Sequence, residues 1–306
     1  MPTLSVIIPT FNRAHLLVDT IRSARKGGTD LEIIVVDDGS TDATPDICRQ
    51  AGDLRYVRLA ENSGPSHARN TGIRESRADL VAFLDDDDLR LPGTFDRQVA
   101  ILLDTPDAAL VHAPAFVGDS RFGLPTGRIR PELCLRGDIF WQLLEANPIV
   151  TSTVVARKAA LERAGLFDTN LEAMEDYDLW ARVASDHPIE ALDEPVIVYR
   201  GRSLASGQIT SNRAAFEASR RHLLEKLFSM PRAKAAPASV RRRARRRHMS
   251  VTLNSLVEDA AEALVEGDAR AARACLWTAI RHDPFHLKAH ASLLSLLCRS
   301  LVERLG

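Results

Sequence analysis

The sequence has few cysteines, no long hydrophobic segment and almost no net charge. Its four cysteines include no CxxC pair, which argues against a disulfide framework or a zinc site and fits a reducing cytoplasm. No segment approaches the ~20 consecutive apolar residues of a membrane-spanning helix. No basic stretch followed by a long apolar core marks a signal peptide. Because 45% of the residues are hydrophobic and 26% are charged, we expect a mostly globular, cytoplasmic protein.

The net charge of -1 conceals one strongly basic segment. Six arginines fall within residues 241–247, so the rest of the chain is acidic. Such a segment either contacts an anionic surface or is a solvated linker or helix face. No aromatic pattern of an RNA-binding domain accompanies the arginines, so we expect no nucleic-acid partner.

The first part of the chain alternates apolar strands with helical patterns. This alternation is typical of βαβ units and predicts a mostly parallel sheet. The middle is less regular, and the sequence is helical from about residue 212 onward. The predicted strands of the first part are Ser5–Ile8, Glu32–Val36, Arg55–Leu59, Leu80–Leu84 and Ala109–His112. We predict four segments, with boundaries 1–115, 116–230, 231–249 (a basic linker) and 250–306 (a helical tail).

One apolar stretch ends abruptly in four carboxylates. Val81–Leu84 is followed directly by Asp85, Asp86, Asp87 and Asp88. Four acids at the end of a buried strand repel one another and lose solvation, which is costly unless a positive group lies there. A divalent cation with oxygen ligands would satisfy them. The alternative is a solvated acidic turn that starts the next helix.

Polar clusters also follow two other predicted strands. Pro9–Asn12 comes after the first strand and Asp37–Ser40 after the second. In a parallel sheet, ligands bind beyond the carboxyl ends of the strands. Three polar clusters at such ends predict one shared site.

These clusters, in this order, resemble the family 2 glycosyltransferases. The resemblance is carried by Ser5–Arg13, Ile33–Asp42, Asn62–Gly72 and Phe83–Asp88, and by Glu175–Trp180, which resembles the family's ED motif. It covers roughly residues 3–202. It implies the GT-A fold, which is a Rossmann-like nucleotide-binding α/β domain with a mostly parallel central sheet, here with a C-terminal α-helical extension. In this fold residues 1–115 would bind the nucleotide-sugar and residues 116–230 the acceptor.

The resemblance also implies an activity and assigns donor-site residues. The expected reaction is an inverting, metal-dependent sugar transfer of the hexosyltransferase type, from a nucleotide-sugar to an acceptor hydroxyl, with Mn²⁺ or Mg²⁺ as cofactor. Asp85 and Asp87 occupy the acidic positions of the DxD motif, and Asp87 is the better candidate for direct metal contact. Asp86 would meet ribose or sugar hydroxyls, and Asp88 would cap a helix. Asp38 matches the base-binding aspartate, because a carboxylate can accept the N3–H of uracil. Its alternative is turn chemistry, since Asp-Gly-Ser is common in turns.

Other residues of the donor site are assigned less directly. Pro9, Thr10 and Asn12 would form the floor under the base. Arg69 would either face the nucleotide or balance the negative charge of the aspartates, and the sequence favours neither interpretation. Arg13 is either part of this site or a solvated residue of the first helical turn.

Asp176 is the predicted general base. Inverting transfer needs a carboxylate that takes the proton of the attacking hydroxyl. The alternative is that Glu175 and Asp176 merely decorate a helix N-terminus, where the helix dipole favours acids. The four upstream motifs favour the catalytic interpretation. Trp180 should belong to the core. Many relatives carry a histidine after the late strand, but Arg200–Leu204 has none, which places a third metal ligand in doubt.

The expected partners follow from the family. They are a UDP-linked or other nucleotide-sugar donor and a glycan, lipid-linked or protein acceptor, in surface polysaccharide or glycoconjugate synthesis. Because many such transferases act on lipid-linked acceptors, we expect Arg241–Arg247 to give peripheral contact with the inner face of the membrane. Residues 263–297 weakly resemble one tetratricopeptide helix pair, which cannot form a solenoid alone. We expect this helical tail to serve either homo-oligomer formation or the docking of a partner.

Two rival functions are considered. A nucleotidyltransferase also joins a βαβ fold to metal-binding acids, but Pro9–Asn12 lacks its glycine-rich, cationic loop. A catalytically inactive transferase-like scaffold could act through its helical tail. The presence of all the matching acids argues against decay.

Overall fold

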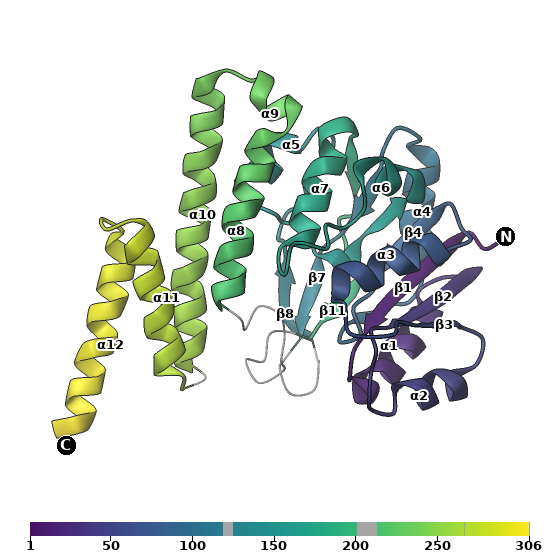
Figure 1. Ribbon diagram of the computed structural model, residues 1–306, viewed down its shortest axis with the longest axis horizontal. Coiled ribbons are helices and arrows are strands. Elements are labelled where there is room, and N and C mark those ends of the chain that lie inside the picture. Colours follow the sequence, from purple (N-terminus) through teal and green to yellow (C-terminus); the bar gives the residue numbers. More distant parts are fainter. Residues whose placement is uncertain (119–124, 201–212, 266, 306) are drawn as a thin grey trace. The chain divides into compact units, whose positions relative to one another are not determined.

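The computed structural model describes residues 1–118, 125–200, 213–265 and 267–305. The chain divides into two compact units (Figure 1). The first contains residues 1–143 and 147–235, and the second contains residues 144–146 and 236–306. The first unit is a mixed α/β domain and the second is helical.

A seven-stranded sheet organises the first unit. Its strand order is β10-β6-β9-β4-β1-β2-β3. All pairings are parallel except those of β9, which runs antiparallel to both β4 and β6. The strands are β1 (Leu4–Thr10), β2 (Leu31–Asp37), β3 (Arg55–Arg58), β4 (Leu80–Phe83), β6 (Leu110–His112), β9 (Val155–Arg157) and β10 (Ile189–Ala191).

Helices cover one face of this sheet because alternate strand residues on that side are apolar. Leu4, Val6 and Ile8 of β1 pack there in one core cluster, since successive side chains of a strand point to opposite faces. The helices contribute matching apolar residues at helical spacing, such as Leu17 and Ile21. They are α1 (Ala14–Lys26), α2 (Thr44–Ala51) and α4 (Thr94–Asp104).

The opposite face packs against α3 (Pro65–Glu75) and α7 (Glu175–Asp186). Gly72 lets α3 approach β1 closely, because a Cβ at this position would lie 2.3 Å from Cγ2 of Ile7. Phe83, Phe167 and Trp180 form an aromatic cluster there, with ring centroids 5.3 to 6.0 Å apart. Trp180 is fully buried, as expected for a core residue. With both faces covered, the sheet is the buried, mostly parallel kind predicted from the sequence.

A smaller sheet and further helices complete the first unit. The sheet has the order β5-β11-β7-β8. Its strands are β5 (Leu89–Arg90), β7 (Ala115–Gly118), β8 (Pro125–Arg130) and β11 (Ile197–Tyr199). The helices are α5 (Phe140–Glu145, which continues into the second unit), α6 (Lys158–Ala164), α8 (Arg213–Ser229), α9 (Pro231–Ala235) and the 3-10 turn η1 (Thr151–Thr153).

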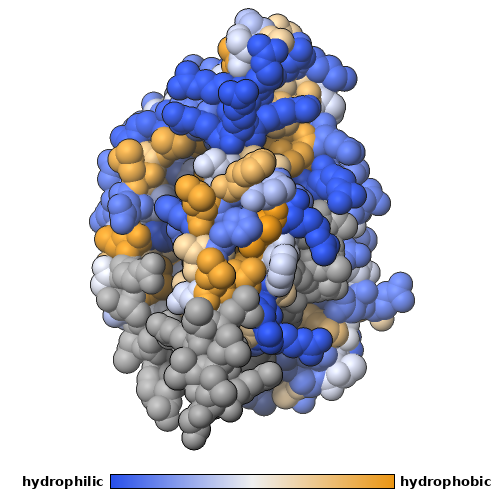
Figure 2. Space-filling model, turned by 90° about the vertical axis from the view of Figure 1, so that its left-hand side faces the viewer, coloured by the Kyte–Doolittle hydropathy of each residue, from blue (hydrophilic) through white to orange (hydrophobic). Residues whose placement is uncertain are grey.

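The second unit consists mainly of α10 (Ala238–Val265), α11 (Ala269–His282) and α12 (Leu287–Leu305). Leu253, Leu256, Leu276 and Leu293 lie in its core. Large apolar side chains are also exposed on α11, on α12 and on the connection between them. They are Trp277, Phe285, Leu287 and Leu294, with exposed fractions of 56 to 87%. Figure 2 shows hydrophobic residues gathered on one face of the molecule among hydrophilic ones.

Residues 231–249, predicted as a linker, are instead largely helical. Pro231 is the first residue of α9, and the carbonyl of Pro237 accepts the first backbone hydrogen bonds of α10. Proline lacks an N–H, but none is needed at a helix start. The arginine-rich segment therefore lies on a helix. No helix in the described parts of the chain is long and apolar enough to cross a membrane.

Candidate active site

The four aspartates after β4 alternate in exposure. Asp86 and Asp88 are buried, whereas Asp85 and Asp87 keep 31% and 19% of their side chains exposed. This alternation is typical of an extended segment, in which successive side chains point to opposite sides. The accessible pair can receive a ligand, while the buried pair faces the protein.

Asp86 is held by two neighbours. Its Oδ2 accepts a hydrogen bond from Oγ1 of Thr10 (2.7 Å), and its Oδ1 accepts one from Nη1 of Arg13 (2.9 Å). Burial raises the pKa of Asp86 to about 6, although Arg13 opposes this shift. Contact with donor hydroxyls stays a prediction for Asp86, whose carboxylate is buried beneath the loop.

Asp88 does not cap a helix, contrary to the expectation. The residues after it form the short strand β5, and α4 begins only at Thr94. The Oδ1 atom of Asp88 instead accepts a hydrogen bond from the backbone N–H of Arg200 (3.3 Å). Burial, followed by repulsion from Asp87 and Asp85, raises the pKa of Asp88 well above its ordinary value.

The second polar cluster is organised around two buried aspartates. The carboxylate of Asp38 accepts hydrogen bonds from the backbone N–H groups of Ser63 and Gly64, both at 2.8 Å. Burial raises the pKa of Asp38 against these two bonds. Asp37 accepts the N–H of Ser40 at 2.8 Å. Both acids thus shape loops at the carboxyl edge of the sheet, and base binding by Asp38 stays a prediction.

The loop after β1 joins the same edge. Asn12 adopts a positive φ of 54°, a conformation that asparagine tolerates better than most residues. Its backbone N–H donates to Oγ of Ser40 (2.9 Å), and its Oδ1 accepts from the N–H of Thr41 (2.7 Å). Pro9 is buried within β1. The loops after β1 and β2 are therefore joined, as a shared floor would require.

Arg69 of α3 bridges two acidic elements. Its Nη2 contacts Oδ1 of Asp85 and its Nη1 contacts Oε1 of Glu175, both at 2.7 Å. Its side chain is only 7% exposed, and the two carboxylates raise the pKa of its guanidinium against the effect of burial. This contact matches the interpretation in which Arg69 balances acids, and contact with the nucleotide stays a prediction.

Asp176 lies in the first turn of α7, next to Glu175. Its Oδ2 accepts a hydrogen bond from Oγ1 of Thr151 (3.0 Å). Burial and then repulsion from Glu175 raise the pKa of Asp176 to about 6, whereas Arg69 lowers it. A carboxylate with this pKa can accept a proton near neutral pH.

The structure thus brings most of the predicted residues to one edge of the sheet. The acidic loop joins the β1 loop through Thr10 and joins α7 through Arg69.

Sequence reasoning does not find three further residues of the site, which are Thr20, Thr151 and Ser152. The hydroxyl of Thr20 contacts the backbone carbonyls of Asp86 (2.8 Å) and Asp88 (3.0 Å), and Oγ of Ser152 accepts the N–H of Asp85 (3.0 Å). No motif surrounds them, because hydroxyl residues are common throughout a sequence.

The residues fit a divalent cation that also binds a diphosphate. Among the described residues, no group of three or more His, Cys, Asp and Glu side chains is arranged to hold a metal. Two partly exposed carboxylates, Asp85 and Asp87, nevertheless lie two residues apart in the acidic loop. Mg²⁺ sites typically combine one or two carboxylates with substrate phosphates, so this donor set suits such a site.

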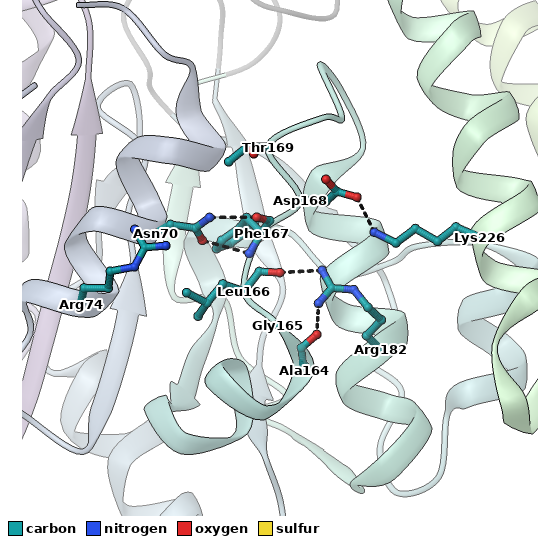
Figure 3. Close-up of a pocket in the computed structure, with 10 residues that line it drawn as sticks. All are labelled: Asn70, Arg74, Ala164, Gly165, Leu166, Phe167, Asp168, Thr169, Arg182 and Lys226. Carbon is teal, nitrogen blue, oxygen red and sulfur yellow. Dashed lines mark hydrogen bonds and ion pairs between the residues drawn. The ribbon is translucent and has the colours of Figure 1, made fainter. Parts of the chain in front are cut away.

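A separate cavity of about 430 Å³ lies elsewhere in the first unit (Figure 3). The side-chain amide of Asn70 makes two hydrogen bonds with the backbone of Phe167, at 2.8 and 2.9 Å. Lys226 contacts Asp168 at 2.6 Å and the buried Asp178 at 2.9 Å. Arg182 also contacts Asp178. No residue of the acidic loop lines this cavity.

The chain belongs to glycosyl transferase family 2. The model of this family, described as "Glycosyl transferase family 2", matches residues 5–164, which is more than half of the 306 residues. The chain is 30% identical over 261 residues to the succinoglycan biosynthesis protein ExoU of Rhizobium meliloti, covering 78% of this chain and 74% of that protein.

Other relatives match over shorter regions. The chain is 29% identical over 195 residues to an uncharacterized glycosyltransferase of Rickettsia conorii, covering 62% of this chain and 32% of that protein. The first such relatives, all from Rickettsia, are covered over only 32 to 62% of their own length. Over 99 residues (30% of this chain and 32% of the relative), it is 42% identical to the GalNAc(5)-diNAcBac-PP-undecaprenol beta-1,3-glucosyltransferase of Campylobacter jejuni.

Solved structures show the same fold. TarS 1-349 of S. aureus in complex with UDP-GlcNAc superposes with a TM-score of 0.63 at 20% identity, covering 97% of this chain and 89% of that chain. The mannosyltransferase PcManGT of Pyrobaculum calidifontis, in complex with GDP-Man and Mn2+, gives 0.57 at 22% identity, covering 99% and 87%. The predicted family and GT-A fold are confirmed.

Proposed function

We propose that this protein is an inverting glycosyltransferase that moves a sugar from a UDP-linked donor to an acceptor hydroxyl, in surface polysaccharide or glycoconjugate synthesis. The observation that carries this proposal is the position of Asp176. This carboxylate has a pKa of about 6 and is linked through Glu175 and Arg69 to Asp85 of the acidic loop. A base beside a donor site is the arrangement that inverting transfer requires.

The proposed chemistry is a single displacement. The acceptor oxygen bonds to the anomeric carbon while the bond from that carbon to the diphosphate breaks. The acceptor proton passes to Asp176, and the electron pair of the broken bond leaves with the nucleoside diphosphate. Thr151 donates a hydrogen bond to Asp176 and so orients its carboxylate for this proton transfer.

Asp85 and Asp87 would hold Mn²⁺ or Mg²⁺ at the leaving group. When bound, such an ion stabilises the charge that develops on the diphosphate. Asp38 would accept the N3–H of uracil with lone pairs that the Ser63 and Gly64 contacts leave available. The UDP-GlcNAc and GDP-Man complexes of similar folds support a nucleotide-sugar donor.

Two measurements test this function. A thermal-shift screen should compare nucleoside diphosphates and nucleotide-sugars in the presence of Mn²⁺. The ligands that carry one particular base should raise the melting temperature of the protein, because a ligand that binds only the folded state stabilises it. NMR of the product of the selected donor should show an inverted anomeric configuration. Retained configuration would refute inversion. Absence of binding to any nucleoside diphosphate would favour an inactive scaffold.

We also propose that the arginine-rich start of α10 contacts anionic lipid at the inner face of the membrane. The exposed side chains there include those of Arg242, Arg243 and Arg246, and clustered arginines attract anionic headgroups. Sedimentation with vesicles containing phosphatidylglycerol at low salt should show binding that disappears at high salt. No binding at low salt would refute this contact.

Self-association of the second unit is a further proposal. It rests on the exposed apolar residues of α11 and α12. A full-length protein that sediments only as a monomer would contradict it.

A further inference from the structure

Arg13 reaches into the acidic loop from the start of α1. It precedes the first residue of that helix, and its carbonyl accepts the N–H groups of Leu16 and Leu17. Its Nη1 atom lies 2.9 Å from Oδ1 of Asp86 and 3.0 Å from Oδ2 of Asp87. One guanidinium nitrogen therefore touches both a buried acid and the predicted metal ligand.

The position of Arg13 relative to the loop is fixed by other contacts. Thr20, in the second turn of α1, bonds the backbone carbonyls of Asp86 and Asp88. Thr10 holds the second carboxylate oxygen of Asp86. These side chains join α1 and β1 to the acidic loop. The backbone around Arg13 is therefore held in a fixed position relative to Asp86 and Asp87.

Arg13 and a metal ion would compete for Asp87. Two cations bound to one carboxylate repel each other, and the repulsion is stronger in a partly buried site than in water. Asp87 has 19% of its side chain exposed and Arg13 has 24%. A metal ion arriving alone would therefore have to displace Arg13 from Asp87 or bind beside a positive charge.

A diphosphate changes this balance. It carries negative charge that can accept the N–H donors of Arg13, and the planar guanidinium suits phosphate oxygens. Arg13 could leave Asp87 while keeping its contact with Asp86, since the two acids are separate partners. Metal and diphosphate that bind together would therefore avoid the repulsion from Arg13 that metal alone meets.

We propose that Arg13 occupies Asp87 in the ligand-free enzyme and releases it only when metal and nucleoside diphosphate bind together. Arg13 is then a coupling residue, which keeps metal affinity low until the donor is present. This inference rests on the proposed function, because it takes Asp87 as a metal ligand.

The test measures Mn²⁺ binding without catalysis. Free Mn²⁺ is followed by electron paramagnetic resonance during titration of wild type and Arg13→Gln, with and without UDP. Wild type should bind Mn²⁺ weakly alone and about tenfold or more tightly with UDP, a coupling within the usual range between two ligands. Arg13→Gln should bind Mn²⁺ alone about tenfold more tightly than wild type and lose most of the enhancement by UDP.

A matched control and a second variant keep the test decisive. Arg22→Gln removes another arginine of α1, which pairs with the exposed Asp19, and it should behave as wild type. Arg13→Lys keeps a positive charge beside Asp86 if the glutamine variant fails to fold. The lysine side chain is one atom shorter than the path to Nη1 of arginine, so its ammonium should hold Asp87 less closely. Mn²⁺ alone should therefore bind this variant about threefold more tightly than wild type.

The outcomes separate this inference from the proposed function. If wild type shows enhancement by UDP but the folded Arg13 variants match it within about twofold, the coupling role is refuted and the metal site stands. If wild type binds no Mn²⁺ even with UDP, both the metal assignment and the coupling role are refuted.

Discussion

The first unit contains two clusters in which acidic side chains pair with basic ones. Both clusters use helices α3 and α7, but they differ in the exposure of their acids. Arg69 of α3 and Asp176 of α7 belong to the candidate active site. From the same two helices, Asn70 lines the cavity of Figure 3, and Asp178 contacts Lys226, which also lines that cavity. At the active site, two aspartates stay partly exposed. In the second cluster, the fully buried Asp178 is contacted by two cations. We infer that the first cluster serves binding and chemistry and that the second fixes the helices.

The largest expected effect comes from Asp176→Asn. The variant should lower sugar transfer by about a hundredfold or more, because an amide cannot accept the acceptor proton. Donor binding should stay within about twofold, since Asp176 acts on the acceptor. Initial rates and thermal-shift titration with the donor measure the two quantities.

Glu172→Gln is the matched control for this change. Glu172 is an exposed acid shortly before α7, and its replacement should leave transfer unchanged. Substantial turnover by the Asp176 variant would remove Asp176 as the base and weaken the contrast between the clusters.

Asp87→Ala should weaken the metal-dependent binding of UDP by about tenfold or more, because a carboxylate ligand of the metal is lost. Titration calorimetry with and without Mn²⁺ gives the affinities. The same UDP affinity as wild type under both conditions would contradict the metal assignment.

Lys226→Met tests the second cluster. It removes one of the two cations at Asp178, so the free energy of unfolding should fall by about 1–3 kcal/mol. Metal-dependent UDP affinity should not change. Urea unfolding provides the first measurement, and Arg221→Met, an exposed change on the same helix, is the control. A loss of UDP affinity without a loss of stability would reverse the roles assigned to the clusters.

The smallest effect concerns pH. Transfer should be half-maximal near pH 6 and fall about tenfold per pH unit below it, because the pKa of Asp176 is raised to about 6 and only the ionised form is a base. A rate that stays constant from pH 7 to pH 5 would contradict this.

The same shift has a defined sign for stability. A raised carboxyl pKa means that the folded state favours the protonated form, so this contribution is complete below the ordinary value of 3.8 and is lost as pH rises through about 6. Asp176→Asn should therefore be at least as stable as wild type at pH 8. A less stable variant at that pH would show that the ionised carboxylate supports the fold.

Much of the fold could be predicted from local pattern. The strands near Ser5, Glu32 and Leu80 are apolar on both sides, so their burial in a parallel sheet follows from composition alone. The turn of Asp38 and the helix start at Glu175 carry motifs that indicate the edge of the sheet where they lie. Family resemblance then supplies the order of these motifs.

The rest depends on contacts between distant residues. The helical structure of the basic segment 231–249 could not be inferred from its prolines, which also mark loops. The role of Asp88 depends on the backbone N–H of Arg200, 112 residues away. The sequence alone leaves open whether Arg13 is solvated or belongs to the site. Only the packing of α1 against the acidic loop distinguishes these two cases.

The reversed direction of β9 has a consequence for which parts of the chain can reach the site. In a sheet where every strand ran the same way, residues that precede a strand would lie far from the ligand edge. Because β9 is antiparallel to β4, Thr151 and Ser152, which precede it, instead meet Asp176 and the backbone of Asp85. A single strand reversal thus lets the later half of the chain supply residues to a surface that the earlier half defines.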